Sequence, residues 1–387
     1  MRPKIVVLCA ALLLVAAVVM TDRHHVQAGE VTPASGYKVL DPIRHGNLTV
    51  FPVVAAKSYS TGEFLTLDEG LHSGEVVVTE AGSVQGLIRR HGSRQYVTPQ
   101  FRRDGAEVNR LVLVNNSKRP LLLLAGEIVS GGKQDRVIGK DRIVPPESDP
   151  VDLSVFCVEP GRWVATTERF GASEALYGGS NGKVAGGPVP MAAMVQPSVR
   201  AKAMADKDQN QVWAEVNKQK DAFMYQVQPA APAAARELAQ TSSYAQVNEN
   251  AEVKKQVDSV ARPIEQSYQS LIHKLRDRNA VGVVVAVNGR IIWADVFAST
   301  DLLSKYWPKL VRSYASEAVV TRAKELEVTS RQAETFLAEM EGRKEMIESE
   351  PGVFRHTEVT GDGFKAFSLT SLLPKTGFEV HVAKMAD

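Results

Sequence analysis

The sequence predicts an α+β fold, with a β-rich N-terminal half of antiparallel sheets and a C-terminal half that holds long helices and a β-hairpin. Between residues 46 and 165, short runs of β-branched and aliphatic residues are separated by Gly, Asn, Pro and charged turns. From about residue 200, the apolar residues recur at spacings of three and four, which is typical of amphipathic helices. Because strands and helices are segregated along the chain rather than alternating, the pattern argues against a doubly wound parallel sheet.

Strands in the first half are expected wherever a short apolar run lies between two turn signals. These runs are Leu48 to Val54, Glu75 to Thr79, Leu87 to Val97, Leu111 to Val114, Leu121 to Leu124 and Val151 to Val158. The polar segment NNSKRP at 115–120 predicts that the runs on either side of it are neighbouring antiparallel strands. The glycine-rich segment 171–190 predicts a long surface loop.

The second half is expected to begin with a helix from about Asp206 to Val227, followed by a proline-rich stretch that interrupts it or links it to the next. The clearest helix runs from Val253 to Leu275, and Asn288-Gly289 between two β-branched runs predicts a hairpin over 281–297. Later elements are predicted as helices at Leu302 to Ala318, with Pro308 as a kink, and Arg331 to Glu348, and strands at Phe364 to Leu369 and Phe378 to Val382. We expect one integrated domain over residues 29–387, with two domains as the alternative.

The N-terminus has the features of a secretory signal peptide over residues 1–28. Arg2 and Lys4 precede an apolar run at 5–20, and Val26-Gln27-Ala28 provides a small-x-small cleavage site. The sequence therefore predicts an exported protein, periplasmic or secreted, with no membrane contact after cleavage. Retention by an uncleaved anchor is the alternative, disfavoured because the apolar run is shorter than the roughly 20 residues that span a bilayer.

The charge balance and the cysteine count bear on two properties, a nucleic-acid partner and a disulfide bond. Cleavage after Ala28 lowers the 46 basic and 44 acidic residues by three and one, to 43 of each. A neutral chain gives no support to a nucleic-acid partner. Of the two cysteines only Cys157 remains, so no intramolecular disulfide is expected. A small buried hydrophobe is the favoured interpretation of Cys157, and a reactive thiol is the alternative.

Two glycine-rich segments match catalytic motifs only in part. A phosphate-binding P-loop requires G-x-x-x-x-G-K-[ST], but Glu127 stands at the first glycine position and Gln134 at the Ser/Thr position. The segment GGSNG at 178–182 satisfies G-x-S-x-G without the preceding strand and following helix of a nucleophile elbow. The histidines show no metal-ligand spacing, so no metal is expected. No cofactor is expected either.

The segment GGKQDR at 131–136 leaves two interpretations open. In the structural one it is a tight turn between two strands, and Glu127 forms an ion pair with Arg136. In the functional one, Gly131 and Gly132 let the backbone approach a ligand, while the side chains of residues 133–136 supply donors and acceptors.

Three stretches, GEIVSGGKQDR at 126–136, IVPP at 143–146 and CVEPGRW at 157–163, resemble the ARG and rhodanese-phosphatase-superfamily-associated protein domain, a domain of unknown function. The segments 281–297 and 301–318 are also similar to this family, so the resemblance covers about residues 46–382. It implies a link with ADP-ribose and NAD-utilising systems through associated domains, and it supplies no established catalytic residues. Asp135 departs from the asparagine more usual there. The ligand-binding candidates implied by the resemblance are Glu127, Gly131, Gly132, Lys133, Gln134, Arg136, Glu159, Arg162 and Trp163.

Three functions are compatible with these residues. The favoured one is an exported binding or scaffold module for an anionic, nucleotide-like or ADP-ribose-like ligand, which requires Lys133, Arg136 and Arg162 to converge on a pocket. The second is a hydrolase acting on such a ligand, with Glu127 or Glu159 as general base. The third is a structural module with a protein partner, in which the motif is buried and bonded internally.

Overall fold

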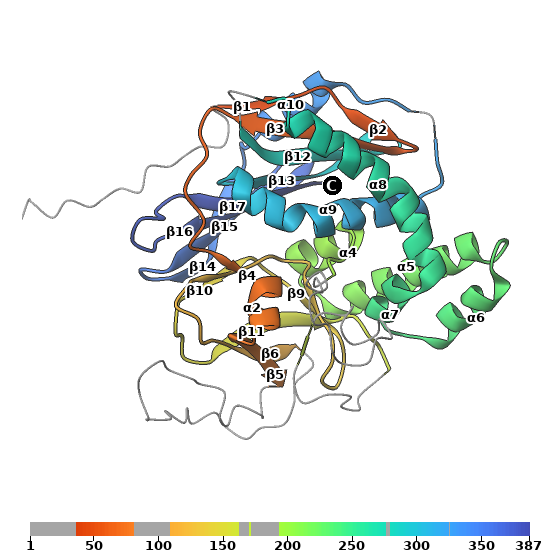
Figure 1. The fold of residues 1–387 in the computed structure, drawn as a ribbon, viewed down its shortest axis with the longest axis horizontal. Coiled ribbons are helices and arrows are strands. Elements are labelled where there is room, and N and C mark those ends of the chain that lie inside the picture. Colours follow the sequence, from red (N-terminus) through yellow and green to blue (C-terminus); the bar gives the residue numbers. More distant parts are fainter. Residues whose placement is uncertain (1–35, 81–108, 162–169, 172–192, 276–278, 325) are drawn as a thin grey trace, which may run out of the picture. The chain divides into compact units, whose positions relative to one another are not determined.

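Strands from both ends of the chain share one nine-stranded antiparallel sheet (Figure 1). The strand order is β1-β3-β12-β13-β17-β16-β15-β14, and β2 pairs with β3. The strands of this large sheet are β1 (Tyr37–Val39), β2 (Ile43–His45), β3 (Leu48–Ala55), β12 (Asn279–Val287), β13 (Arg290–Phe297), β14 (Arg343–Glu350), β15 (Phe354–Gly361), β16 (Phe364–Ser371) and β17 (Glu379–Ala386). The predicted hairpin over 281–297 is therefore β12 and β13, and the α+β class is confirmed.

The computed structural model describes residues 36–80, 109–161, 170–171, 193–275, 279–324 and 326–387, all within the unit Pro33–Asp387. The predicted signal peptide, the expected strand at 87–97 and nearly all of the glycine-rich segment 171–190, with its GGSNG, lie outside these residues. The expected domain boundary at residue 28 stays a prediction for the same reason.

Two smaller sheets come from the first half of the chain. One has the order β5-β6-β11-β9-β8 and the other β10-β7-β4, in which β4 and β7 are parallel. Their strands are β4 (Leu65–Thr66), β5 (Val76–Glu80), β6 (Arg110–Asn115), β7 (Leu121–Leu123), β8 (Ile128–Val129), β9 (Arg136–Ile138), β10 (Arg142–Val144) and β11 (Val151–Cys157). Strand β9 follows the GGKQDR turn where a P-loop would open a helix, which agrees with the rejection of that motif.

The prediction that 111–114 and 121–124 pair with each other is wrong, because β6 and β7 belong to different sheets. The Asn115 amide donates hydrogen bonds to the carbonyls of Arg119 and Pro145, at 2.8 and 2.9 Å. These bonds fix the NNSKRP segment as a connection from one sheet to the other rather than as a hairpin turn.

Most of the helices expected in the second half are present, and an additional helix, α2, lies in the first half. The helices are α2 (Leu67–Ser73), α4 (Pro197–Ala201), α5 (Gln209–Val227), α6 (Pro232–Gln240), α7 (Tyr244–Glu249), α8 (Ala251–Ile272), α9 (Thr300–Val320) and α10 (Ser330–Ala338), with a π-helical turn η1 (Lys202–Asp206). Asp208, Asn250 and Ser299 cap α5, α8 and α9 by accepting backbone N–H groups. The proline-rich linker begins α6, with Pro232 in its first turn, and α9 continues through Pro308.

The helix expected from Arg331 to Glu348 is half as long as predicted. It starts at the predicted cap, where Thr329 and Gln332 form a capping box, but α10 ends at Ala338. The rest becomes β14, which pairs with β15 along its whole length. The composition of this segment favours a helix, and the pairing with a neighbouring strand overrides that weak local preference.

Helices cover both faces of the large sheet. Helices α8 and α9 pack against β3 and β12 in the main core, whereas α10 packs on the opposite face through Ala333 and Leu337. Helix α9 also reaches the three-stranded sheet, since the Tyr306 hydroxyl donates to the Leu122 carbonyl at 2.9 Å. In Figure 1, α9 accordingly runs between the large sheet and the smaller sheets. Within the described ranges, no helix is both long and apolar enough to cross a membrane.

Candidate functional site

Glu127, the acidic residue of the GE pair in the motif, lies in a buried ion cluster with Asp68 and Lys309. The Lys309 ammonium contacts Asp68 Oδ2 at 2.6 Å and also donates to Glu127 Oε1. The second oxygen of Glu127 accepts the Leu124 N–H at 2.7 Å. The Glu127 and Lys309 side chains are 0% and 2% exposed, so water does not screen this pair. We call Asp68, Glu127 and Lys309 the Lys309 cluster.

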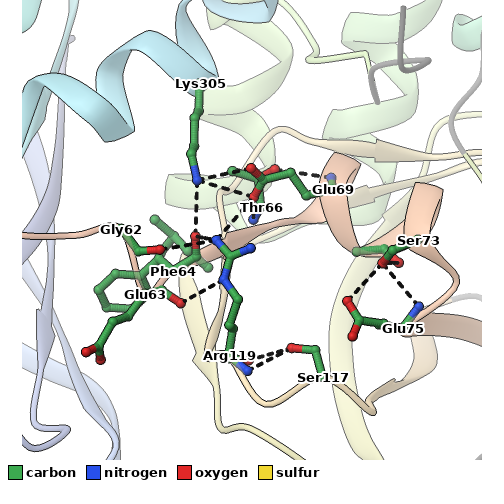
Figure 2. A network of polar contacts seen from close by, with 12 residues as sticks. Gly62, Glu63, Phe64, Thr66, Glu69, Ser73, Glu75, Ser117, Arg119 and Lys305 are labelled. Atoms are coloured by element: carbon green, nitrogen blue, oxygen red, sulfur yellow. Dashed lines mark hydrogen bonds and ion pairs between the residues drawn. The ribbon is translucent and has the colours of Figure 1, made fainter. Parts of the chain in front are cut away.

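A polar network fixes Asp68 by holding the start of α2 against α9. Lys305, one turn before Lys309, approaches Glu69 at 3.0 Å and the Phe64 carbonyl at 3.4 Å (Figure 2). Arg119 donates to the same carbonyl at 2.8 Å, while Thr66 and Glu69 form a capping box. Successive turns of α9 therefore position Lys305 at Glu69 and Lys309 at Asp68.

Two carboxylates and one ammonium in dry surroundings shift each other's protonation. Burial and the charge of Asp68 raise the pKa of Glu127, although Lys309 opposes the shift. Burial alone would lower the pKa of Lys309, but Asp68 and Glu127 hold it above its usual value. The cluster therefore keeps a charged lysine beside a glutamate that takes up a proton more readily than usual.

A second buried cluster, which we call the Arg200 cluster, comprises Arg200, Asp295, His381, Asp141 and Tyr314. Arg200 Nη1 donates to both oxygens of Asp295 at 2.9 Å, and the Tyr314 hydroxyl also donates to Asp295. His381 joins the two acids, with Nε2 at 3.1 Å from Asp295 and Nδ1 at 2.6 Å from Asp141. These side chains come from α4, β13, β17, α9 and the turn before β10, so the cluster ties together the large sheet, two helices and the smaller sheets.

The charges of the Arg200 cluster balance when His381 is protonated. Burial disfavours the charged form of His381, but Asp141 and Asp295 favour it and raise the pKa of His381 from 6.5 to about 9. Burial would raise the pKa of Asp295, yet Arg200 and His381 hold it far below its usual range. The pKa of Asp141 is also below its usual value, because the charge of His381 outweighs the effect of burial. Two cations and two anions are thus paired with each other away from solvent, as a buried ionic network requires.

The backbone at residues 124–127 connects the two clusters. Ala125 N–H donates to Asp141 Oδ1 at 2.7 Å, next to the Leu124 N–H that donates to Glu127. Gly126 has φ +95°, and a Cβ there would lie 2.9 Å from Arg200 Cδ. The glycine before Glu127 is therefore required by the close approach of the Arg200 side chain.

The GGKQDR turn is held by bonds within the protein. Asp135 Oδ1 accepts the Gly131 N–H at 2.9 Å, its Oδ2 accepts from the Ser243 hydroxyl at 2.6 Å, and its own N–H donates to Glu159. Lys133 N–H donates to Glu80 at 2.8 Å. The turn thus connects the five-stranded sheet to the start of α7.

Gly132 in this turn has φ +52°, and a Cβ there would lie 2.3 Å from the Phe170 ring. Gly132→Ala should therefore destabilise the protein by about 1–3 kcal/mol more than Gly363→Ala, because only the first adds overpacking to the left-handed backbone. At Gly363, with φ +72°, nothing lies within 4 Å of an added Cβ. Urea unfolding of both variants measures this difference. Equal losses would show that the Phe170 contact is not limiting.

The nine candidate residues do not all meet at one place. Glu127 lies in the Lys309 cluster, whereas Gly131, Gly132, Lys133, Gln134 and Glu159 lie in or beside the turn, where the Gln134 amide donates to the Glu159 carbonyl. Arg136 is fully buried on β9. Arg162 and Trp163 lie outside the described residues. The expected Glu127–Arg136 ion pair is wrong, because α9 brings Lys309 to Glu127 instead.

A pocket of about 100 Å³ opens beside the Lys309 cluster, and we call it the Lys309 pocket. Three cationic side chains line it, namely Lys254 from α8 and Lys309 and Arg312 from α9. Its other lining residues include the acidic Glu249, which pairs with Lys254, and Met194, whose backbone pairs with that of Glu127. In the described parts of the chain, no group of three His, Cys, Asp or Glu side chains is arranged to hold a metal ion.

The sequence matches the model of a known protein family. The model of the ARG and Rhodanese-Phosphatase-superfamily-associated Protein domain, ARPP-1, matches residues 36–383. The chain belongs to this family. No curated protein and no solved structure matches the chain. The family match covers both buried clusters and the three sheets up to residue 383 in β17, so the clusters are part of the ARPP-1 domain itself.

Sequence reasoning missed most of the charged residues that this ARPP-1 domain buries. Lys309, Asp295 and His381 each stand inside an apolar stretch, on the inner face of α9 and in the interiors of β13 and β17. A charged residue at a core position of a predicted helix or strand is a signal that could have found them. Cys157, by contrast, is buried as expected, and burial raises the pKa of its thiol, which disfavours the reactive thiolate.

Proposed function

We propose that this protein is an exported binding module that holds a small anionic group in the Lys309 pocket. The observation that supports it is the convergence of Lys254, Lys309 and Arg312 on one cavity next to Glu127 of the family motif. Cationic side chains on two neighbouring helices suit a phosphate or carboxylate group, which they bind through charge-assisted hydrogen bonds.

Two of the cationic side chains that line the pocket form ion pairs with which a ligand would compete. Lys254 pairs with Glu249 at 2.5 Å, and Arg312 pairs with Asp258; the two cationic side chains are 34% and 42% exposed. Their partners Glu249 and Asp258 are only 10% and 18% exposed, so an incoming anion must compete with these two carboxylates for the cations. Lys309 instead stays fixed between its two buried partners.

The size of the pocket limits what it encloses. A cavity of about 100 Å³ takes a phosphate or carboxylate group rather than a whole nucleotide. A nucleotide-like or ADP-ribose-like ligand would therefore place one charged group inside and extend along α8. There, Lys254, Lys255 and Arg262 line a wider neighbouring groove.

Hydrolysis of such a ligand is less well supported than binding. A general base needs an oxygen within reach of a water molecule. Glu127 has both oxygens bonded, to Lys309 and to the Leu124 N–H, and Glu159 accepts the Asp135 N–H. In this proposal the GGKQDR turn supports the site rather than forming it.

Thermal unfolding of the chain from residue 29 tests the proposal, with phosphate, ADP-ribose, AMP and, as an uncharged comparison, ribose. An anion present at about 100 times its Kd should stabilise the wild type by about 2.7 kcal/mol, whereas ribose should not. Lys254→Ala and Arg312→Ala should lose this effect.

Lys218→Ala is the matched control, since Lys218 on α5 also pairs with a glutamate but does not line the pocket. Lys133→Ala should also keep the ligand effect. Loss of the effect in Lys133→Ala alone would assign the ligand to the turn, and failure of every anion to stabilise the wild type would refute binding. Export is tested separately by N-terminal sequencing of the mature protein, which should begin after Ala28.

A further inference from the structure

The Lys309 pocket contains a carboxylate, which is unfavourable in a site for a fully ionised anion. Of the described residues that line the pocket, Glu249 alone carries a carboxylate, and it stands among the cationic Lys254, Lys309 and Arg312. A carboxylate repels an anion and has no proton to donate to it. An anion without a proton would therefore bind more tightly if Glu249 were absent, so its position points to a ligand that the carboxylate attracts.

Glu249 keeps one of its two oxygens available. Its Oε2 accepts from Lys254 at 2.5 Å, whereas its Oε1 accepts no hydrogen bond from the described residues and is not closed off from solvent. Asp258, the partner of Arg312, differs in this respect, because its two oxygens accept from Arg312 and Arg262. The free oxygen of Glu249 is thus the one that can accept from a ligand.

Two hydroxyls of the pocket are also limited to accepting. Ser313 Oγ donates to the Val195 carbonyl at 2.7 Å, and Ser316 Oγ donates to the Arg312 carbonyl at 2.9 Å. A hydroxyl has a single proton, so only its lone pairs then remain for a ligand. The Asn248 amide has both donor and acceptor groups and suits either kind of ligand. The lining therefore offers cations to an ionised oxygen and acceptors to a proton.

These groups together suit an anion that keeps a proton. The Lys254 ammonium has three protons, so it can contact an ionised oxygen of such a ligand without releasing Glu249. The P–OH group of hydrogen phosphate can at the same time donate to Glu249 Oε1, whereas sulfate has no proton to donate. Hydrogen bonds with an ionised partner are the stronger ones, so this difference favours phosphate.

We propose that the Lys309 pocket binds hydrogen phosphate, with Glu249 Oε1 accepting the hydrogen bond of its P–OH group while Lys254 and Arg312 contact its ionised oxygens. This inference rests on the anion site of the proposed function and narrows it to one ligand. Glu249 then selects a protonated oxyanion over a fully ionised one, because it attracts the first and repels the second.

Isothermal titration calorimetry of the full chain at about pH 8 tests the proposal with free phosphate, sulfate and methyl phosphate. At this pH, above the second pKa of a phosphate group, all three are dianions, but only free phosphate still carries a proton. Methyl phosphate represents the terminal phosphate of a nucleotide. The wild type should bind free phosphate at least about tenfold more tightly than either of the other two.

Glu249→Gln should remove this selectivity, because the neutral amide does not repel sulfate and can donate to it. The affinities of the variant for phosphate and sulfate should lie within about threefold of each other, with sulfate bound more tightly than by the wild type. Glu252→Gln is the matched control, since Glu252 on α8 also pairs with a lysine but does not line the pocket. It should keep the preference of the wild type.

Equal affinity of the wild type for phosphate and sulfate would overturn this inference and leave the anion site of the proposed function in place. Methyl phosphate that binds as tightly as free phosphate would do the same, since it has no proton to donate. Failure of all three dianions to bind would overturn both proposals. A phosphate preference that survives in Glu249→Gln, shown to be folded by a thermal melt, would overturn the role of Glu249.

Discussion

Lys309→Met is expected to lower the free energy of unfolding by about 3–5 kcal/mol, because it leaves two buried carboxylates without their cation. Asp68 and Glu127 both bond to this ammonium, and Glu127 has no exposure to water. Methionine has a similar length, so the loss reflects charge more than packing. Chemical denaturation of the wild type and the variant measures the effect.

Lys305→Met is the matched control one turn earlier on the same helix. Lys305 pairs with Glu69, and the two side chains are 22% and 38% exposed, so this loss should not exceed about 1 kcal/mol. In the Lys309→Met background, Asp68→Asn and Glu127→Gln together should restore much of the stability, since they remove the two negative charges that Lys309 neutralised. Similar losses for Lys305→Met and Lys309→Met, with no rescue, would contradict the electrostatic account.

The second large effect is a pH-dependent contribution from His381. Its pKa is raised from 6.5 to about 9, because Asp141 and Asp295 favour the charged form more than burial disfavours it. The folded protein therefore holds this proton more tightly than the unfolded chain. The resulting stabilisation, about 3 kcal/mol, is fully present below about pH 6.5 and is lost as the pH rises through about 9.

The test compares the wild type with His381→Gln by urea unfolding at about pH 6 and about pH 9.5. The difference in the free energy of unfolding between the two proteins should shrink by about 3 kcal/mol at the higher pH. Comparing the pair cancels the titration of groups that do not interact with His381. Both proteins carry Glu379→Gln, because burial raises the pKa of Glu379 to about 7 and the charge of His381 lowers it. His72→Gln, on the exposed end of α2, should show no such change. A difference that stays constant with pH would show that His381 is neutral in the fold.

Elements set by local patterns were predictable from the sequence. Asn288-Gly289 defined the β12–β13 hairpin, and the apolar stripe from Val253 to Leu275 defined α8. Pairings between distant segments were not, since nothing near β3 indicates that it pairs with β12, more than 200 residues later. The same limit explains β14, where a partner strand determined the structure against the local preference.

In the candidate site, too, residues in a local motif were predictable and contacts between distant segments were not. Glu127 was identifiable because it stands in a motif of the family, but its partners come from α2 and from α9. No local spacing relates Asp68, Glu127 and Lys309, because the fold alone brings these three segments together. The Arg200 cluster draws on five separate segments and is even less accessible to sequence reasoning.

The position of the last strand has a consequence for how the chain is made. Residues 379–386 form β17, which lies between β13 and β16 in the interior of the large sheet and carries His381. The ribosome makes these residues after β13 and β16, so both neighbouring strands have an open edge until β17 has been synthesised. A nascent chain therefore cannot complete its main sheet or its Arg200 cluster before β17 has been made, although the smaller sheets can form earlier.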